Sequence, residues 1–347
     1  MKRINTVICT LTLFFMFLSC RNSSSEYVSS CEYAGYFDIS DSSVVVMSPF
    51  AENIDVFSVK DPVDNIICMS SSHVACLSSI GADSLISAVS GLRYISDTAL
   101  SERGCIDIGF DGGLDYEKIM SLDPDVVTAY SVGGTLPPYV SKLRSLGIRV
   151  LVLYDHMETH PLARAEYMRL FGTLTGRRHI ADSVFNDLVC RYMRVADDAL
   201  RKNGGAPKAV MVNIPYGDVW YIPGEDSYLS CLIKDAGGWI IGAGKGSGSS
   251  VITMEDAYRY SQDADVWLNP GYCRTREQLS AVHQLFPMFG PIAENRPIYN
   301  NTLKITPEGG NDFYESGVVR PDLILEDLIS IFSSQSEPEK LNYFIPL

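Results

Sequence analysis

Two segments of this chain share one pattern of residues, and this repetition restricts the folds that the chain can adopt. The segment EKIMSLDPDVVTAY begins at Glu117, and the segment EDAYRYSQDADVWLNP begins at Glu255. Each copy predicts a helix with a glutamate in its first turn, an acidic turn, a short apolar strand and then a loop containing glycine and tyrosine. Another helix follows in each half. The chain is therefore predicted to contain two similar lobes, with Glu117 and Glu255 in equivalent places.

Short apolar strands alternate with helices in both halves, which favours an α/β fold with mostly parallel sheets covered on both faces. Serines at residues 70–72 offer a helix N-cap, and Gly81 closes the helix that follows. Residues 33–60 predict short strands joined by turns. The other strands are predicted at residues 66–69, 86–89, 105–108, 126–129, 149–153, 209–212, 265–268 and 297–299.

The middle of the chain predicts two successive helices, at residues 161–174 and 177–202, without a strand between them. In the second helix apolar side chains recur every four residues, which makes a stripe suited to packing along its length. At 1.5 Å per residue this helix reaches roughly 40 Å, enough to bridge two lobes. The stripe consists of Ile180, Val184, Leu188 and Tyr192.

Residues 1–19 have the features of a signal segment. Lys2 and Arg3 precede an apolar stretch of about signal-peptide length, which ends FLSC at Cys20. This pattern resembles a bacterial lipoprotein signal. It predicts lipid on Cys20, a flexible tether over residues 20–32, and a protein anchored in the cell envelope at a periplasmic or outer membrane face. A plain secretory signal and a single anchor helix are the alternatives.

Length and composition narrow the functional classes. About 320 residues follow the signal, more than one core usually supports, so two domains are expected. None of them forms an apolar stretch long enough for a membrane helix. The formal charge of −14 becomes about −16 without Lys2 and Arg3, which repels nucleic acid. Seven of the nine cysteines lie beyond Cys20 without a CxxC pair, which favours small buried hydrophobes and leaves one or two disulfides open.

Several segments, in order, carry a family resemblance. The chain resembles the periplasmic solute-binding proteins for vitamin B12 and ferric siderophores over about residues 64–333, through NIICMSSSHVACLSSIGADSLISAVSG, DIGFDGGLDYEKIMSLDPDVVTAY, LPPYVSKLRSLGIRVLVL, IKDAGG, the repeat at Glu255 and RPDLILEDL. The resemblance implies two Rossmann-like lobes, a long rigid interlobe helix, one ligand in the cleft between the lobes, and no enzymatic activity. The implied partner is the permease dimer of an ABC importer with its ATPase, and the receptor itself is expected to be a monomer.

The resemblance also sets the expected boundaries of the domains. They are residues 33–157 for the N-terminal lobe, 158–205 for the linking helices, 206–333 for the C-terminal lobe and 334–347 for a tail.

Members of that family dock onto their permease through one glutamate on each lobe, which meets arginines of the permease subunits. The resemblance places Glu117 and Glu255 in these roles. Exposed carboxylates in equivalent positions can steer a twofold-symmetric partner and fix its register. The alternative is that an acid in a first helical turn only complements the helix dipole.

Ligands of α/β sheets bind beyond the carboxyl ends of the strands, and aromatic residues follow several predicted strands here. Flat aromatic walls suit a large planar macrocycle or chelate. The alternative is that strand-end aromatics only edge the core. By family position Tyr94, Tyr130 and the pair Trp220 and Tyr221 match cleft residues. The full set of predicted ligand-binding residues is Ser72, His73, Tyr94, Tyr130, Trp220, Tyr221, Tyr272, Phe313 and Tyr314.

The ligand class is predicted from what the candidate loops lack. Hydroxamate binders of the family can carry an arginine where this chain has Phe110 and Asp111. A strongly anionic ferric catecholate favours a basic cleft, and few arginines lie near the loops. A corrinoid is bulky and nearly neutral, so cobalamin is preferred over an iron-siderophore or haem. The ligand then carries cobalt or iron, and no resident cofactor is expected.

Two other functional classes have weaker support. A free zinc or manganese receptor could use His156 and His160, but Pro161 disfavours helical geometry at His160, so no metal site is expected. An extracytoplasmic enzyme is the second alternative. Residues 244–250 look like a phosphate-binding loop but lack the GxxxxGK[ST] spacing, and neither GxSxG nor HExxH occurs.

Overall fold

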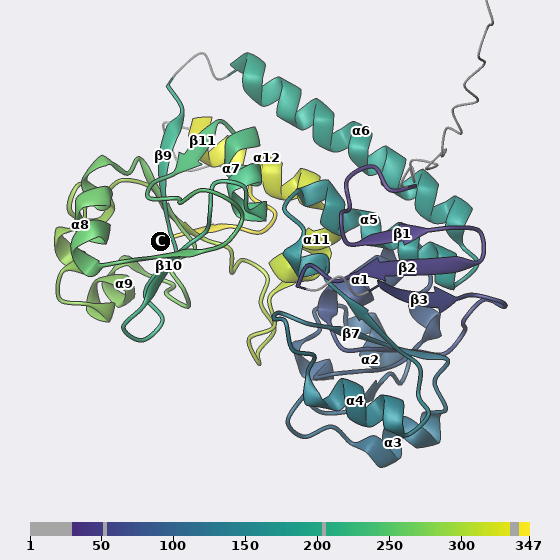
Figure 1. Cartoon of the computed structure of the whole chain (residues 1–347). Helices are drawn as coiled ribbons and strands as arrows, with labels where there is room; N and C mark the ends of the chain where they lie inside the picture. The colour runs from purple at the N-terminus through teal and green to yellow at the C-terminus, as the bar shows by residue number, and fades with distance from the viewer. Residues whose placement is uncertain (1–29, 51–53, 203–205, 334–339) are drawn as a thin grey trace, which may run out of the picture.

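The computed structural model describes residues 30–50, 54–202, 206–333 and 340–347. Two α/β lobes are joined along one side by the long helix α6 (Arg178–Lys202), as Figure 1 shows. The predicted signal over residues 1–19, the predicted lipidation site Cys20 and residues 20–29 of the predicted tether lie outside the described residues. The predicted fold class is confirmed.

The first lobe is built on a five-stranded parallel sheet with strand order β6-β5-β4-β7-β8. The strands β4, β7 and β8 are buried along nearly their whole length, because helices cover both faces of the sheet. Each strand lies within one residue of its predicted bounds. The elements are β4 (Ile66–Cys68), α1 (Ser71–Ser79), β5 (Ile86–Val89), α2 (Thr98–Glu102), β6 (Ile106–Asp107), α3 (Tyr116–Leu122), β7 (Val126–Tyr130), α4 (Pro138–Ser145) and β8 (Val150–Leu153).

The second lobe repeats this plan with strand order β11-β9-β13-β14-β15, in which only β15 is antiparallel. Its elements are β9 (Lys208–Val212), α7 (Tyr228–Asp235), β11 (Gly238–Ile240), α8 (Met254–Asp263), β13 (Val266–Leu268), α9 (Arg276–Val282), α10 (Gly290–Ala293), β14 (Ile298–Asn300), α11 (Ser316–Val319), α12 (Pro321–Ser333) and β15 (Ile345–Pro346).

The end of the chain differs from the predicted tail over residues 334–347. The strand β15 extends the second sheet beside β14. Asp327 of α12 holds the approach to this strand, because its carboxylate accepts the backbone N–H of Asn342 at 2.8 Å and of Tyr343 at 2.7 Å. Tyr343 and Phe344 are buried. Two buried aromatic residues and one buried carboxylate therefore make residues 342–346 part of the lobe.

Two small antiparallel sheets lie outside the lobes' parallel sheets. The first, β1 (Phe37–Ile39), β2 (Ser43–Met47) and β3 (Ile54–Ser58), agrees with the strands expected over residues 33–60. The second pairs β10 (Trp220–Ile222) with β12 (Ser250–Ile252) and was not predicted. Residues 244–250, considered above as a phosphate-loop candidate, lead into β12.

The lobes are linked by α5 (Pro161–Leu174) and α6, which pack closely against each other. At about 1.5 Å per residue, the length of α6 is about 37 Å, and the helix contacts α12 and α7 of the second lobe as well as α5. In the predicted stripe Leu188 and Tyr192 are buried, whereas Ile180 and Val184 are only partly buried. The stripe is completed by Ala181 and Phe185, because the true helical period is 3.6 residues rather than four.

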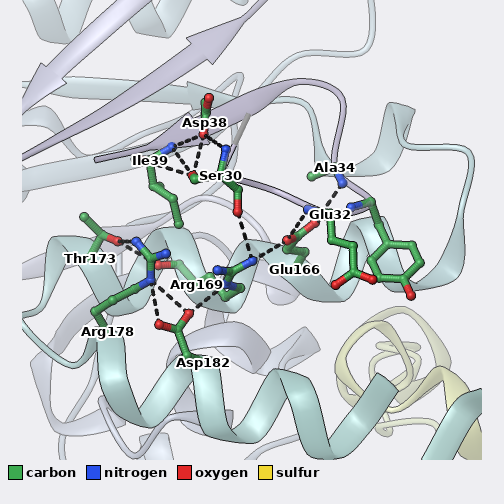
Figure 2. Close-up of polar contacts among 11 residues, drawn as sticks. Ser30, Glu32, Ala34, Asp38, Ile39, Glu166, Arg169, Thr173, Arg178 and Asp182 are labelled. Carbon is green, nitrogen blue, oxygen red and sulfur yellow. Dashed lines mark hydrogen bonds and ion pairs between the residues drawn. The ribbon is translucent and has the colours of Figure 1, made fainter. Parts of the chain in front are cut away.

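The segment at residues 30–36 is fixed by two carboxylates, one on α5 and one directly ahead of this helix. Glu166 of α5 accepts three successive backbone N–H groups of this segment at 2.8–2.9 Å. Glu158 accepts the next two at 3.0 Å. Figure 2 shows Arg169 placed between Glu166 and Asp182 of α6, 2.7 Å from each carboxylate. Residues 30–32, predicted as part of the tether, are therefore bound to the fold.

Candidate functional site

A cavity of about 950 Å³ lies between the lobes, where the carboxyl ends of the strands of both sheets meet. From the first lobe, Ser71 lines it at the start of α1 and Ser90 directly after β5. From the second lobe, Asn213 and Asn269 line it directly after β9 and β13, together with residues 305–311. The volume is at the upper end of the range for ligand pockets. We therefore take this cavity as the candidate ligand site.

Residues 305–311 bring the second lobe into contact with the first. A Cβ on Gly310 would overlap the carbonyl oxygen of Tyr94, so only glycine allows this close approach. The hydroxyl of Thr306 donates to the carbonyl of Arg93 at 3.2 Å. These contacts fix one wall of the cavity across the two lobes.

A second contact between the lobes is made by Glu315, which directly precedes α11. Its carboxylate accepts the backbone N–H of Ser96 at 2.7 Å and of Asp97 at 2.9 Å, in the loop before α2. Burial raises the pKa of Glu315 to about 7, although the two backbone hydrogen bonds act to lower it. A separate cavity of about 800 Å³ lies beside this contact, and residues 305–307 line both cavities.

Three of the predicted aromatic residues line the cavity, namely Tyr94, Tyr272 and Tyr314. Tyr216, which was not predicted, also lines it. The exposed fractions of Tyr216 and Tyr272 are 86% and 92%, so neither ring is packed into the core. Open tyrosine rings present flat apolar surface with a polar tip, which suits contact with a planar ligand.

Two of the predicted aromatic residues lie in the core instead. Trp220 is 2% exposed, stacks on Trp267 and Phe289, and donates its indole N–H to the carbonyl of Val212 at 3.1 Å. Phe313 is buried in the second lobe beside Phe344. Position at the end of a strand does not tell which side chain points to the cleft, because that depends on how the following residues turn.

Two of the predicted polar residues are also buried away from the cavity. The imidazole of His73 lies 3.0 Å from the hydroxyl of Thr128 and 3.7 Å from Asp155. The hydroxyl of Ser72 lies 2.8 Å from that of Ser70. Burial acts to raise the pKa of Asp155, but the neighbouring histidine rings and Arg164 hold it well below its ordinary value. These groups form an internal polar cluster, and the neighbouring Ser71 lines the cavity in place of Ser72.

The two remaining predicted aromatics lie outside the set that lines the cavity. Tyr130 is half-buried at the end of β7, with its ring centroid 6.0 Å from that of His156. Tyr221 is 47% exposed in β10. Its carbonyl accepts the side-chain N–H of Asn213 at 3.1 Å, so β10 supports a cavity residue through its backbone.

The charged side chains that line the cavity are Arg274 and Glu308, among the residues the structure describes. Their formal charges cancel. Arg93 lies over the rings of Tyr94 and Phe110, at 5.1 and 5.6 Å from the ring centroids. Within the described part of the chain no histidine, cysteine or aspartate lines the cavity. The cavity is therefore close to neutral and offers tyrosine, amide and hydroxyl groups.

The main residues that the sequence analysis missed are the asparagines that line the cavity. Asn213, Asn269 and Asn300 end three neighbouring strands of the second sheet. The signal was present in the sequence, because NIP, NPG and YNN each follow an apolar strand. It was hidden because asparagine is also common in turns.

The two glutamates of the repeat occupy the same position in equivalent helices. Glu117 is the second residue of α3, and Glu255 is the second residue of α8. Both are exposed. The N-terminus of α3 is capped by Asp115, and that of α8 by Thr253 with Asp256. Within the described residues neither glutamate side chain has a hydrogen bond or ion pair, so neither is needed as a cap.

A second group of possible metal ligands lies outside the cavity. His160, Cys231 and Asp235 place one ligand atom each within 4.8 Å of one another. However, Nδ1 of His160 accepts the backbone N–H of Leu162 at 3.1 Å as the N-cap of α5, with extended backbone as predicted before a proline. The proton of the neutral ring then lies on Nε2, which leaves no lone pair for a metal. His160 and His156 also share no helix.

Comparison with known proteins gives consistent matches. A sequence profile of the family described as "Periplasmic binding protein" matches residues 66–282. An uncharacterized lipoprotein of Methanocaldococcus jannaschii is 26% identical over 314 residues, which cover 85% of this chain and 70% of that protein.

Solved structures with the same fold include two ligand-binding proteins. A periplasmic haem-binding protein from Pseudomonas aeruginosa has a TM-score of 0.62 at 17% identity, covering 82% of this chain and 98% of that one. A periplasmic vitamin B12-binding protein of Vibrio cholerae has a TM-score of 0.57 at 13% identity, covering 78% of this chain and 96% of that one.

Proposed function

The chain belongs to the periplasmic binding protein family, and we propose that it is the membrane-anchored substrate-binding component of an ABC importer that captures a metal chelate. The observation that carries this proposal is the interlobe cavity of about 950 Å³ at the carboxyl edges of both sheets. The family is one of binding proteins rather than enzymes.

The ligand we propose is a large, nearly neutral metal chelate, with cobalamin preferred over haem or an iron-siderophore. Four tyrosines line the cavity, and the formal charges of Arg274 and Glu308 cancel. A flat macrocycle gains apolar contact with such rings, whereas a strongly anionic chelate requires more basic residues than are present. The scarcity of ionisable ligands among the described lining residues also favours a chelate over a free zinc or manganese ion.

The proposed partner is the permease dimer, which Glu117 and Glu255 contact. The two carboxylates are exposed, lie at the same helical position in each lobe, and make no contact that the fold requires. A twofold-symmetric permease presents the same surface twice, so two equivalent carboxylates can engage two equivalent basic patches.

The proposed anchor is a lipid on Cys20. The support is the signal pattern in the sequence and the similarity to a lipoprotein. In the portion of the chain with described coordinates, no helix is both long enough and apolar enough to cross a bilayer. Localisation at a membrane face of the cell envelope is therefore proposed to depend on this cysteine.

The ligand is tested by calorimetric titration of the purified protein with cyanocobalamin, haem and a ferric siderophore. We expect cyanocobalamin to bind tightly, with the other two weaker. Haem or siderophore binding without cyanocobalamin binding would replace the preferred ligand while keeping the proposed role. If none of the three binds at tens of micromolar, the proposed role is wrong.

A further inference from the structure

The cavity wall of the second lobe contains three asparagines at one register. Val212 pairs with Leu268, and Leu268 pairs with Tyr299, in the adjacent parallel strands β9, β13 and β14. The residues that follow are Asn213, Asn269 and Asn300, so the three lie next to one another along the carboxyl edge of the sheet. We call these three residues the asparagine row. All three line the cavity.

The orientation of two of these side chains is fixed by their partners. The side-chain N–H groups of Asn300 donate to the carbonyls of Gly271 at 2.6 Å and Cys273 at 2.9 Å. That of Asn213 donates to the carbonyl of Tyr221 at 3.1 Å. A carbonyl oxygen only accepts, so neither amide can be turned around. In both residues the side-chain N–H groups donate to backbone carbonyls of the protein, and the amide oxygen remains as a hydrogen-bond acceptor.

Two oxygens of the row have no hydrogen-bond partner in the described structure. They are Oδ1 of Asn269 and Oδ1 of Asn300, and both atoms are buried. The side chain of Asn300 is completely buried. A buried acceptor without a partner costs free energy, so native proteins rarely keep one without a reason. In the wall of a ligand cavity, a donor on the ligand can supply the missing partner.

The backbone shows that asparagine is not required at these positions for its conformation alone. Asn213 and Asn269 have φ values of 64° and 57°, in the left-handed region. Glycine adopts this conformation more easily than asparagine. The side chains therefore add something that a glycine would not, namely amide groups in the wall of the cavity.

We propose that the asparagine row is the specificity element of the cavity and accepts hydrogen bonds from neutral N–H donors, such as primary amides, on the edge of the ligand. This inference rests on the proposed function, because it takes the cavity as the transport site. A carboxylate on the ligand edge would place acceptor against acceptor, whereas an amide N–H satisfies the buried oxygens. A site built to hydrogen-bond a donor discriminates strongly against an analogue that lacks it.

The test uses Asn269, because glycine fits its φ without strain. Asn269→Gly removes the acceptor, and Asn269→Asp keeps an acceptor oxygen at the same place. Asn295→Gly is the matched control, because Asn295 is exposed, lies outside the cavity and has a φ of 55°. Each variant and the wild type are titrated with cyanocobalamin, with cyanocobalamin in which one amide is hydrolysed to a carboxylate, and with haem.

For wild type we expect cyanocobalamin to bind at least about 10-fold more tightly than its most affected monocarboxylate. Asn269→Gly should weaken cyanocobalamin about 10-fold and reduce this discrimination. Asn269→Asp should bind cyanocobalamin within a few-fold of wild type but discriminate more strongly against the monocarboxylate. Asn295→Gly should change nothing. The melting temperature of ligand-free Asn269→Gly should equal or exceed that of wild type, because an unpartnered buried oxygen is removed.

The outcomes separate the inference from the proposed function. Cyanocobalamin affinity that is equal in Asn269→Gly and wild type overturns the role of the row and keeps the proposed function. Haem binding without cyanocobalamin binding also overturns the row while keeping a chelate importer. Absence of binding by these three probes and by a ferric siderophore overturns both. A melting temperature that falls in Asn269→Gly together with affinity assigns the residue a structural role and overturns the inference.

Discussion

The two buried glutamates Glu158 and Glu315 predict an unusual dependence of stability on pH. Burial raises the pKa of each from an ordinary value of 4.5 to about 7. The folded state therefore binds more protons than the unfolded chain between about pH 4.5 and 7. The stability that each protonated glutamate contributes is fully present below about pH 4.5. This contribution falls as the pH rises and is lost above about pH 7. At about 1.4 kcal/mol per pKa unit, the loss is up to about 3 kcal/mol for each glutamate.

The clearest perturbation is Glu315→Gln, which removes the ionisation at the contact between the lobes. Urea unfolding of wild type and variant at about pH 5.5 and about pH 8 gives the free energy of unfolding at each pH. We expect the fall in stability between these values to be about 2 kcal/mol smaller in the variant, because the raised pKa of about 7 lies about 1.5 pH units above the lower value. Glu102→Gln, at an exposed position, is the matched control and should keep the wild-type slope.

The comparison between variants is needed because other groups also titrate at neighbouring pH values. Burial lowers the pKa of His160, which acts in the opposite sense below its ordinary value of 6.5. Carboxylates such as Asp182 and Asp322 have lowered pKa values through their arginine partners, although burial acts against this, and they affect stability only in more acidic solution. Equal losses of stability in Glu315→Gln and wild type between the two pH values would show that Glu315 does not have a raised pKa in the folded protein.

Three further predictions concern the other elements of the proposal. Glu117→Arg combined with Glu255→Arg should abolish uptake of the ligand into cells. The calorimetric affinity for the ligand should stay unchanged, because both side chains lie outside the cavity. Normal uptake would remove the docking assignment. Glu166→Ala should destabilise the protein by about 3 kcal/mol or more, because three backbone N–H groups and Arg169 lose a buried partner. Residues 30–34 should then become exposed to proteolysis, and cleavage at the wild-type rate contradicts this prediction. Tyr272→Ala and Tyr314→Ala should each weaken the binding of cyanocobalamin by about 10-fold in calorimetry. Neither should lower the melting temperature, because the two side chains are 92% and 53% exposed. Affinity equal to that of wild type would exclude stacking on these rings.

The repeated pattern in the sequence was sufficient for the architecture. Buried parallel strands such as β5 and β7 are continuous apolar runs bounded by turn residues, so they are visible one at a time. The strands β10 and β15 were missed because they are short and depend on partners distant in sequence, such as β12 and β14. Local patterns carry no information about such pairing.

The candidate site was predicted less completely than the fold. Tyr94, Tyr272 and Tyr314 line the cavity, whereas Trp220 and His73 pack inside the lobes. All five are polar or aromatic residues that follow a predicted strand in the sequence, so sequence position cannot separate them. The direction of each side chain is decided by the turn after the strand and by the packing of neighbouring rings. The row of asparagines depended on the register between strands, which only the structure provides.

The way residues 30–36 are bound also decides where mechanical load enters the molecule. If the proposed lipid holds the protein to a membrane, a pull from the membrane reaches Asp38 on β1 through Ser30. It also reaches Glu166 and Arg169 on α5, and Arg169 is bonded to Asp182 on α6. Both helices belong to the pair that connects the lobes, and not to either lobe. A load on the anchored receptor therefore enters through residues that do not line the cavity between the lobes.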